Sequence, residues 1–149
     1  MGKNLVIIGG GAGGASTAAE AKRNDSSLNV TILQKGKFVS YASCPTPYYI
    51  GDLIKDHTKL VARTPERFSR DGIDVQLDAE VINIDSTKKV VDLKDGRQLP
   101  YDILVMATGT SAIVPQMTGI DLPGVYALRN LQDAIHIKSW LRERNAKRV

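Results

Sequence analysis

The chain has 149 residues, of which 42% are hydrophobic, a length and composition that suit one domain with a buried core. It contains no apolar run of the roughly 20 residues that a membrane-spanning helix requires, and its first residues lead directly into a strand rather than a signal sequence, so we expect a cytoplasmic protein without a membrane partner. The net charge is +4, but basic and acidic residues are mixed along most of the chain, so we expect no nucleic-acid partner.

The first quarter of the chain has the order strand, glycine-rich turn, helix, strand. Residues 5–8 form a short apolar run, residues 9–14 include five glycines, and residues 15–22 are rich in alanine. Polar residues at 24–27 end the helix, and residues 30–33 supply a second apolar run. This order predicts a βαβ unit with a parallel sheet.

The glycine-rich turn predicts a dinucleotide site. Gly9, Gly11 and Gly14 have the spacing G-x-G-x-x-G between a strand and a helix, where backbone N–H groups and the positive helix end bind a pyrophosphate. The alternative, a tight turn without a ligand, would rarely need five glycines in six positions. At the end of the second strand, where such folds place an acidic ribose ligand, the chain has Gln34. We expect this amide to bind ribose more weakly than a carboxylate would, or else to be a solvated strand end.

The rest of the chain returns to regular patterns after an irregular segment at 38–51 that is rich in Pro, Tyr and Ser. We predict strands over 75–85 and 89–93 on either side of a turn, and a buried strand over 101–107. Residues 130–144 carry apolar side chains at helical spacing and predict an amphipathic helix. These elements indicate an α/β fold, a parallel sheet with helices on both faces, plus a small antiparallel β-meander.

Cys44 is the only cysteine, which excludes an internal disulfide and a cysteine metal cage, and the two histidines lack ligand spacing, so we predict no metal site. A lone cysteine is most often a buried small hydrophobe. A chemical role requires the thiolate, which makes up only about one-tenth of an ordinary thiol near neutral pH. Pro45 suits the first position of a helix, so we expect Cys44 to cap that helix and to ionise more readily at its positive end. The neighbouring hydroxyl donors are Ser40, Tyr41 and Ser43.

The segment Phe38 to Gly51, FVSYASCPTPYYIG, resembles the active-site segment of coenzyme A-disulfide reductases and their relatives, the NADH oxidases, NADH peroxidases and polysulfide or persulfide reductases. The resemblance covers the whole chain in the family's order. It continues at Arg63-Thr64-Pro65-Glu66, Gly72-Ile73-Asp74-Val75, Ala107-Thr108-Gly109 and Leu128 to Ala134. It implies a Rossmann-like FAD-binding fold in which Cys44 lies beside the flavin and cycles between a thiolate and an oxidised form.

The resemblance also implies roles for individual residues. The glycine turn would hold the FAD pyrophosphate, Gln34 the adenosine ribose, and the backbone of Val81 the adenine. The implied cofactor-binding residues are Gly9, Gly10, Gly11, Ala12, Gly13, Gln34, Lys35, Val81, Ala107, Thr108, Gly109, Thr110 and Arg129. The implied catalytic residue is Cys44, and the implied substrate-binding residues are Arg23, Ser40 and Ser43.

Three positions depart from parts of that family. Ala12 stands where the peroxidases and water-forming oxidases carry a histidine that faces the cysteine, which favours thiol or sulfur substrates over peroxide. Ser43 and Glu20 replace the Asn and Gln that are typical of reductases for coenzyme A disulfide. Because Glu20 would repel a phosphorylated substrate, a smaller disulfide, a persulfide or a polysulfide stays open beside coenzyme A disulfide.

By the same resemblance, residues 1–149 are the truncated FAD-binding domain of a longer, homodimeric enzyme whose NAD(P)-binding and dimerisation domains are absent from this chain. The expected activity is transfer of electrons from NAD(P)H through FAD and Cys44 to a small-molecule sulfur substrate. The alternatives are an NADH oxidase, a flavin reductase for a ferredoxin-type or rubredoxin-type carrier, and a non-catalytic nucleotide-binding module that senses redox state.

Overall fold

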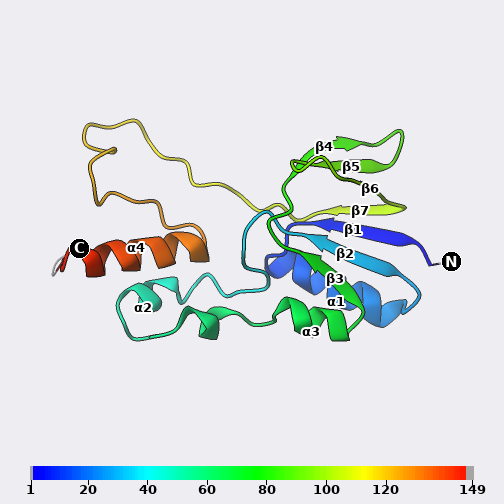
Figure 1. The fold of residues 1–149 in the computed structure, drawn as a ribbon, viewed down its shortest axis with the longest axis horizontal. Coiled ribbons are helices and arrows are strands. Elements are labelled where there is room, and N and C mark those ends of the chain that lie inside the picture. The colour runs from blue at the N-terminus through cyan, green and yellow to red at the C-terminus, as the bar shows by residue number, and fades with distance from the viewer. Residues whose placement is uncertain (1, 147–149) are drawn as a thin grey trace. The chain divides into compact units, whose positions relative to one another are not determined.

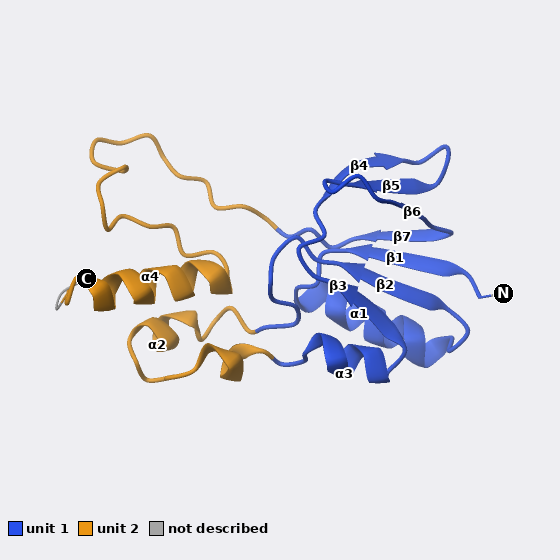
Figure 2. Ribbon diagram, in the orientation of Figure 1, with its two compact units in different colours: residues 1–41, 62–109 blue, residues 42–61, 110–149 orange. Residues whose placement is uncertain are grey.

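A computed structural model describes residues 2–146, so that residues 147–149, at the end of the expected domain, lie outside the described part. The chain forms two compact units (Figure 2). Unit 1 contains residues 1–41 and 62–109, and unit 2 contains residues 42–61 and 110–149.

Unit 1 is built on a four-stranded sheet with the order β3-β2-β1-β7 (Figure 1). The strands are β1 (Asn4–Ile8), β2 (Asn29–Leu33), β3 (Ile73–Gln76) and β7 (Ile103–Met106). Every neighbouring pair is parallel, as the predicted βαβ unit requires. The α/β class with a parallel sheet is therefore confirmed.

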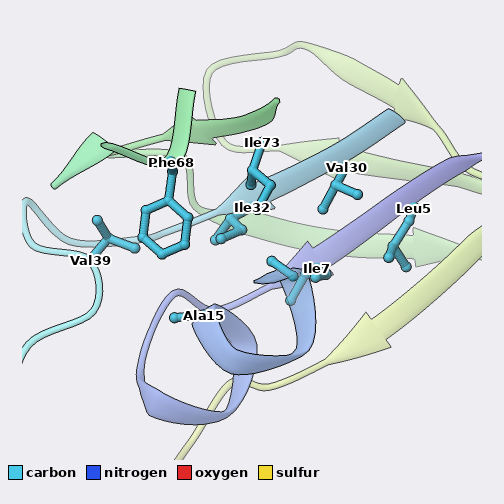
Figure 3. Close-up of a cluster of buried hydrophobic side chains, with 9 residues drawn as sticks. Leu5, Ile7, Ala15, Val30, Ile32, Val39, Phe68 and Ile73 are labelled. Atoms are coloured by element: carbon cyan, nitrogen blue, oxygen red, sulfur yellow. The ribbon is translucent and has the colours of Figure 1, made fainter. Parts of the chain in front are cut away.

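Helices α1 (Ala12–Asn24) and α3 (Pro65–Arg70) cover one face of this sheet. Strand side chains alternate between the two faces, and those on this side pack against Ala15 and Ala18 of α1 and against Phe68 of α3 (Figure 3). The strand residues and the loop residue in this cluster are Leu5, Ile7, Val30, Ile32, Ile73 and Val39.

A three-stranded antiparallel sheet covers the opposite face. It consists of β4 (Val81–Asp85), β5 (Val90–Leu93) and β6 (Gln98–Pro100), in that order. Its buried residues pack with the alternate residues of the parallel strands, among them Val6 and Ile8. The small β-meander is thus confirmed, but the expected helices on both faces are not seen among the described residues, because the meander buries the second apolar face instead.

Three details of the strand prediction were wrong. The buried strand expected over 101–107 is β7, which spans four residues and has none buried, because it lies at the edge of the sheet and pairs with β1 alone. The single strand expected over 75–85 is two strands, β3 and β4, which belong to different sheets. The chain turns between them, and Asp78 there has a φ of +53°, in the left-handed region that ends a strand. The short strand β6 was not predicted, because three residues that end in Pro100 carry no alternating pattern.

Unit 2 contains the five-residue helix α2 (Thr46–Ile50), the 3-10 helix η1 (His57–Leu60) and the longer helix α4 (Leu131–Glu143). Helix α4 begins with a capping box, in which Asn130 and Asp133 each accept a hydrogen bond from the other's backbone N–H. The predicted amphipathic helix is confirmed, with α2 packed against it. No described helix is both long and apolar enough to cross a membrane.

Candidate functional site

Three predicted cofactor residues meet at one edge of the parallel sheet. Ile8 of β1 lies opposite Leu33 of β2 and Met106 of β7, so that the three strands end together. The next residues along the chain are Gly9, Gln34 and Ala107. The N–H of Gly9 donates to Leu33 O at 2.8 Å, and the N–H of Ala107 donates to Ile8 O at 2.8 Å. The carboxyl ends of parallel strands are where open α/β sheets bind their ligands.

Packing explains three glycines of the turn. Gly9 has a φ of +102°, and a Cβ there would overlap the carbonyl group of Ala107. A Cβ on Gly14 would overlap the carbonyl oxygen of Gly9, and one on Gly10 would lie 2.7 Å from Cγ2 of Val39. These positions need glycine because the strand, the helix and the loop approach one another closely.

Packing does not explain Gly11 and Gly13. A Cβ built on either residue meets no protein atom within 4 Å, neither residue has a positive φ, and both are exposed. Gly11 is the N-cap of α1, no side chain caps this helix end, and its first turn has no acidic residue. The first N–H groups of a helix have no partner within the helix, and the glycines leave space beside them. This arrangement fits the pyrophosphate of a dinucleotide.

Gln34, the expected ribose ligand, lies against this turn. Its Oε1 accepts a hydrogen bond from the N–H of Gly10 at 2.8 Å, which ties the end of β2 to the turn. The backbone carbonyl of Gln34 accepts a hydrogen bond from Ala79 at 3.0 Å, so the segment that leads into Val81 runs beside it. The expected pyrophosphate, ribose and adenine ligands of unit 1 are therefore brought together.

Lys35 forms an ion pair with Glu80, which was not predicted from the sequence. Its Nζ lies 2.7 Å from Oε1 of Glu80, and Lys94 contacts the other oxygen of Glu80 at 3.0 Å. The hydrogen bond from Lys35, followed by that from Lys94, holds the pKa of Glu80 below its ordinary value. Because 45 residues separate Lys35 from Glu80, no local pattern in the sequence indicated this pair.

Thr110 and Arg129, both in unit 2, are also brought together. Nη2 and Nε of Arg129 donate to Oγ1 of Thr110 at 3.1 and 3.3 Å. The backbone N–H of Arg129 donates to Asp133 at 2.9 Å, which fixes Arg129 at the start of α4. Thr108 and Gly109, which follow Ala107, are exposed, and Gly109 has a φ of +66°.

The expected substrate ligand Arg23 lies at the far end of α1, roughly 15 Å along the helix from the glycine turn. It lines a cavity of about 460 Å³ that is rich in basic side chains. Glu20 forms an ion pair with Arg23, and Arg63 forms one with Asp71 at 3.2 Å. The cavity is lined by Ala19, Lys22, Arg23, Arg63, Arg67, Asp71 and Ile73. Lys22 and Arg67 were not predicted from the sequence, because only the fold brings residues of α1 and α3 to the same cavity.

Ser40 connects the glycine turn to the segment that carries Arg63. Its N–H donates to Gly10 O at 2.7 Å, and its carbonyl accepts hydrogen bonds from Ala62 at 2.7 Å and Arg63 at 3.4 Å. Ser40 has a φ of +48°, in the left-handed region. The expected substrate residue Ser40 therefore lies where the loop after β2 returns to the turn.

Cys44 is exposed, so the interpretation as a buried small hydrophobe is wrong. It stands two residues before α2, whose N-cap is Pro45, so the expectation that Cys44 itself caps this helix is also wrong. The carbonyl of Ser43 accepts hydrogen bonds from the N–H and the Oγ1 of Thr46 at 3.2 and 2.7 Å. This tight turn places Cys44 at its exposed tip.

The family model described as pyridine nucleotide-disulphide oxidoreductase matches residues 3–149. The chain belongs to this family. Curated relatives include an NADH oxidase of Methanocaldococcus jannaschii, 35% identical over 97% of the chain, and an NAD(P)H sulfur oxidoreductase (CoA-dependent) of Pyrococcus abyssi, 38% identical over 99%. A solved structure of reduced CoADR-RHD from Bacillus anthracis is 32% identical over 97% of the chain, with a TM-score of 0.87.

The match to these proteins covers only part of their length. The chain spans 33% of each of the two curated relatives and 27% of the solved chain. The family resemblance inferred from the sequence is confirmed over nearly the whole of this chain.

Proposed function

We propose that the intact protein is an FAD-dependent oxidoreductase that uses NAD(P)H to reduce a disulfide, persulfide or polysulfide through Cys44. The observation that carries the proposal is the open backbone at Gly11 and Gly13, at the carboxyl edge of a parallel sheet in a chain of this family. The lone, exposed Cys44 supplies the only thiol of the chain.

When bound, FAD supplies the two-electron carrier between NAD(P)H and Cys44. The Sγ thiolate of Cys44 attacks one sulfur of a disulfide, which forms a mixed disulfide and releases one thiolate. The two electrons of one NAD(P)H hydride then cleave the mixed disulfide, which releases the second thiolate and restores the Cys44 thiolate, while the proton of the hydride passes to solvent. No second cysteine of this chain is needed, in agreement with its composition.

The basic cavity supports a substrate that carries an anionic group. Four basic side chains and one acidic side chain line it, and the acidic one, Asp71, is paired with Arg63. Glu20, which the sequence suggested would repel a phosphate, has its charge offset by Arg23. Ala12 adds no proton donor at the glycine turn, which favours sulfur substrates over peroxide. We further propose, on the family resemblance, a cytoplasmic homodimer.

The test is the Cys44→Ser variant of the full-length protein. A serine hydroxyl stays protonated, so NAD(P)H-dependent reduction of disulfides and polysulfides should fall by at least about a thousandfold, while bound FAD stays stoichiometric by absorbance. The matched control is Ser86→Ala, in the exposed turn between β4 and β5, which leaves the thiol and its neighbours in place and should keep the full activity. Undiminished sulfur reduction by Cys44→Ser would instead support the carrier-protein reductase.

A further inference from the structure

Two residues after helix α2 ends, the backbone has a conformation that favours glycine. The N–H groups of Asp52 and Ile54 donate to Tyr49 O and Tyr48 O at 3.3 and 3.0 Å, so the chain folds back over the helix end. Asp52 has a φ of +63°, in the left-handed region where helices usually place glycine. Aspartate is one of the few residues besides glycine that adopt this conformation readily, and the carboxylate of Asp52 is also paired with two basic side chains.

The partner of that carboxylate is Lys138 of α4, which is only 2% exposed. Its Nζ lies 2.9 Å from Oδ1 of Asp52 and donates to Tyr49 O at 2.6 Å and to Ile54 O at 3.3 Å. The same Nζ lies 3.9 Å from the centroid of the Tyr49 ring. Lysine is almost never this buried unless it is paired, and every partner here belongs to the segment that follows Cys44.

Arg142 of α4 also binds Asp52 and can be compared with Lys138. It contacts the same Asp52 oxygen at the same distance, 2.9 Å, but its side chain is 62% exposed. The hydrogen bond from Lys138, ahead of that from Arg142, holds the pKa of Asp52 below its ordinary value. Exposed ion pairs contribute little to stability, so the buried Lys138 is the contact that fixes the segment.

Helix α2 needs such an anchor because it has five residues, far fewer than the roughly 12 that an isolated helix requires to form. We propose that Lys138 is a positioning residue for Cys44. It binds the C-terminal end of α2 and thereby fixes the turn that presents the thiol. This proposal rests on the proposed function of Cys44.

The experiment compares Lys138→Met with Arg142→Gln in the full-length protein, at a temperature where circular dichroism shows both variants folded. For Lys138→Met we expect kcat for a disulfide substrate to fall by at least about tenfold, because misplacement of a reacting group by an ångström is that costly, while KM for the substrate stays unchanged. Arg142→Gln should keep kcat within about twofold of the wild type, because Lys138 still holds Asp52. A folded Lys138→Met variant with a wild-type kcat would show that Lys138 acts on stability alone and would overturn the proposal.

Hydrogen exchange tests the anchor without reference to activity. In Lys138→Met, the amides of residues 43–54 should exchange about tenfold faster, while those of β1 and β2 stay unchanged. Unchanged exchange over 43–54 would also overturn the proposal. If the wild-type protein reduces no sulfur substrate, the proposed function fails, and the exchange result still shows whether Lys138 holds the segment.

If Lys138→Met does not fold, Asp52→Gly takes its place, because glycine suits this backbone and removes the carboxylate partner of Lys138. Faster exchange over 43–54 and a kcat lowered by about threefold are expected. Wild-type values of both in folded Asp52→Gly would contradict the proposal.

Discussion

The side-chain oxygen of Gln34 accepts the N–H of Gly10, so this residue orders the glycine turn, and we propose that it also binds the ribose. A carboxylate in its place has a second oxygen for a ribose hydroxyl and a charge that strengthens both bonds. An amide provides the same geometry without the charge. We therefore expect that glutamine in place of an acidic residue lowers the affinity for the cofactor and leaves the shape of the turn unchanged.

For Gln34→Glu in the full-length protein, we predict FAD binding tighter by about 1 kcal/mol, measured by titration of flavin release. The gain should be present at neutral pH and lost as the pH falls through the carboxyl range near 4, because the new side chain then becomes neutral. Gln132→Glu, an equal change of charge on the exposed face of α4, is the control and should leave affinity unchanged. Equal or weaker binding by Gln34→Glu would argue against Gln34 as a ribose ligand.

Alanine substitutions at two glycines of the turn separate the effect on folding from the effect on cofactor binding. Gly11→Ala should leave the unfolding free energy within about 1 kcal/mol of the wild type, because its Cβ meets no protein atom, but should weaken FAD binding by at least about tenfold. Gly14→Ala should destabilise the fold by about 2 kcal/mol or more, because its Cβ overlaps the carbonyl of Gly9. Urea unfolding and flavin titration measure the two effects; unimpaired binding by Gly11→Ala would contradict a pyrophosphate site there.

At the scale of elements, local patterns predicted the βαβ unit and α4, because both depend on residues close in sequence. The same patterns predicted β3 and β4 as a single strand, because the turn at Asp78 contains no glycine or proline. The basic cavity and the ion pair of Lys35 with Glu80 each bring together residues more than 40 positions apart. The periodicity of a sequence reports only on neighbouring residues, so it predicted neither. Lys138 did carry a sequence signal, because it falls on the apolar stripe of α4 where a lysine needs a buried partner.

The junction of α2 and α4 gives a prediction for acid unfolding. Because the pKa of Asp52 is lower in the folded state, its contribution to stability is present above the carboxyl pKa of the unfolded chain, near 4, and is lost as the pH falls through the folded value. Asp52→Asn should therefore lower the melting temperature of the full-length protein at pH 7, with a difference that narrows below about pH 4. A difference that stays constant between pH 7 and pH 3 would show that the charge of Asp52 does not matter.

At the scale of the whole molecule, the two units divide the proposed chemistry. Unit 1 carries the glycine turn and Gln34, and unit 2 carries Cys44. The chain passes between the units after Tyr41, after Val61 and after Gly109. Three site residues expected from the sequence lie within two positions of these crossing points: Ser40, Ser43 and Thr110. The backbone segments that link the units therefore also carry site residues of both units.

The most direct test of a redox role for Cys44 is mass spectrometry of the full-length protein, quenched with an alkylating reagent after a single turnover. With a disulfide substrate and limiting NAD(P)H, we predict a mixed disulfide on the peptide that contains Cys44, at one per chain, which disappears when more NAD(P)H is added, at a rate no slower than kcat. Turnover without this adduct, or an adduct that decays more slowly than kcat, would contradict the account.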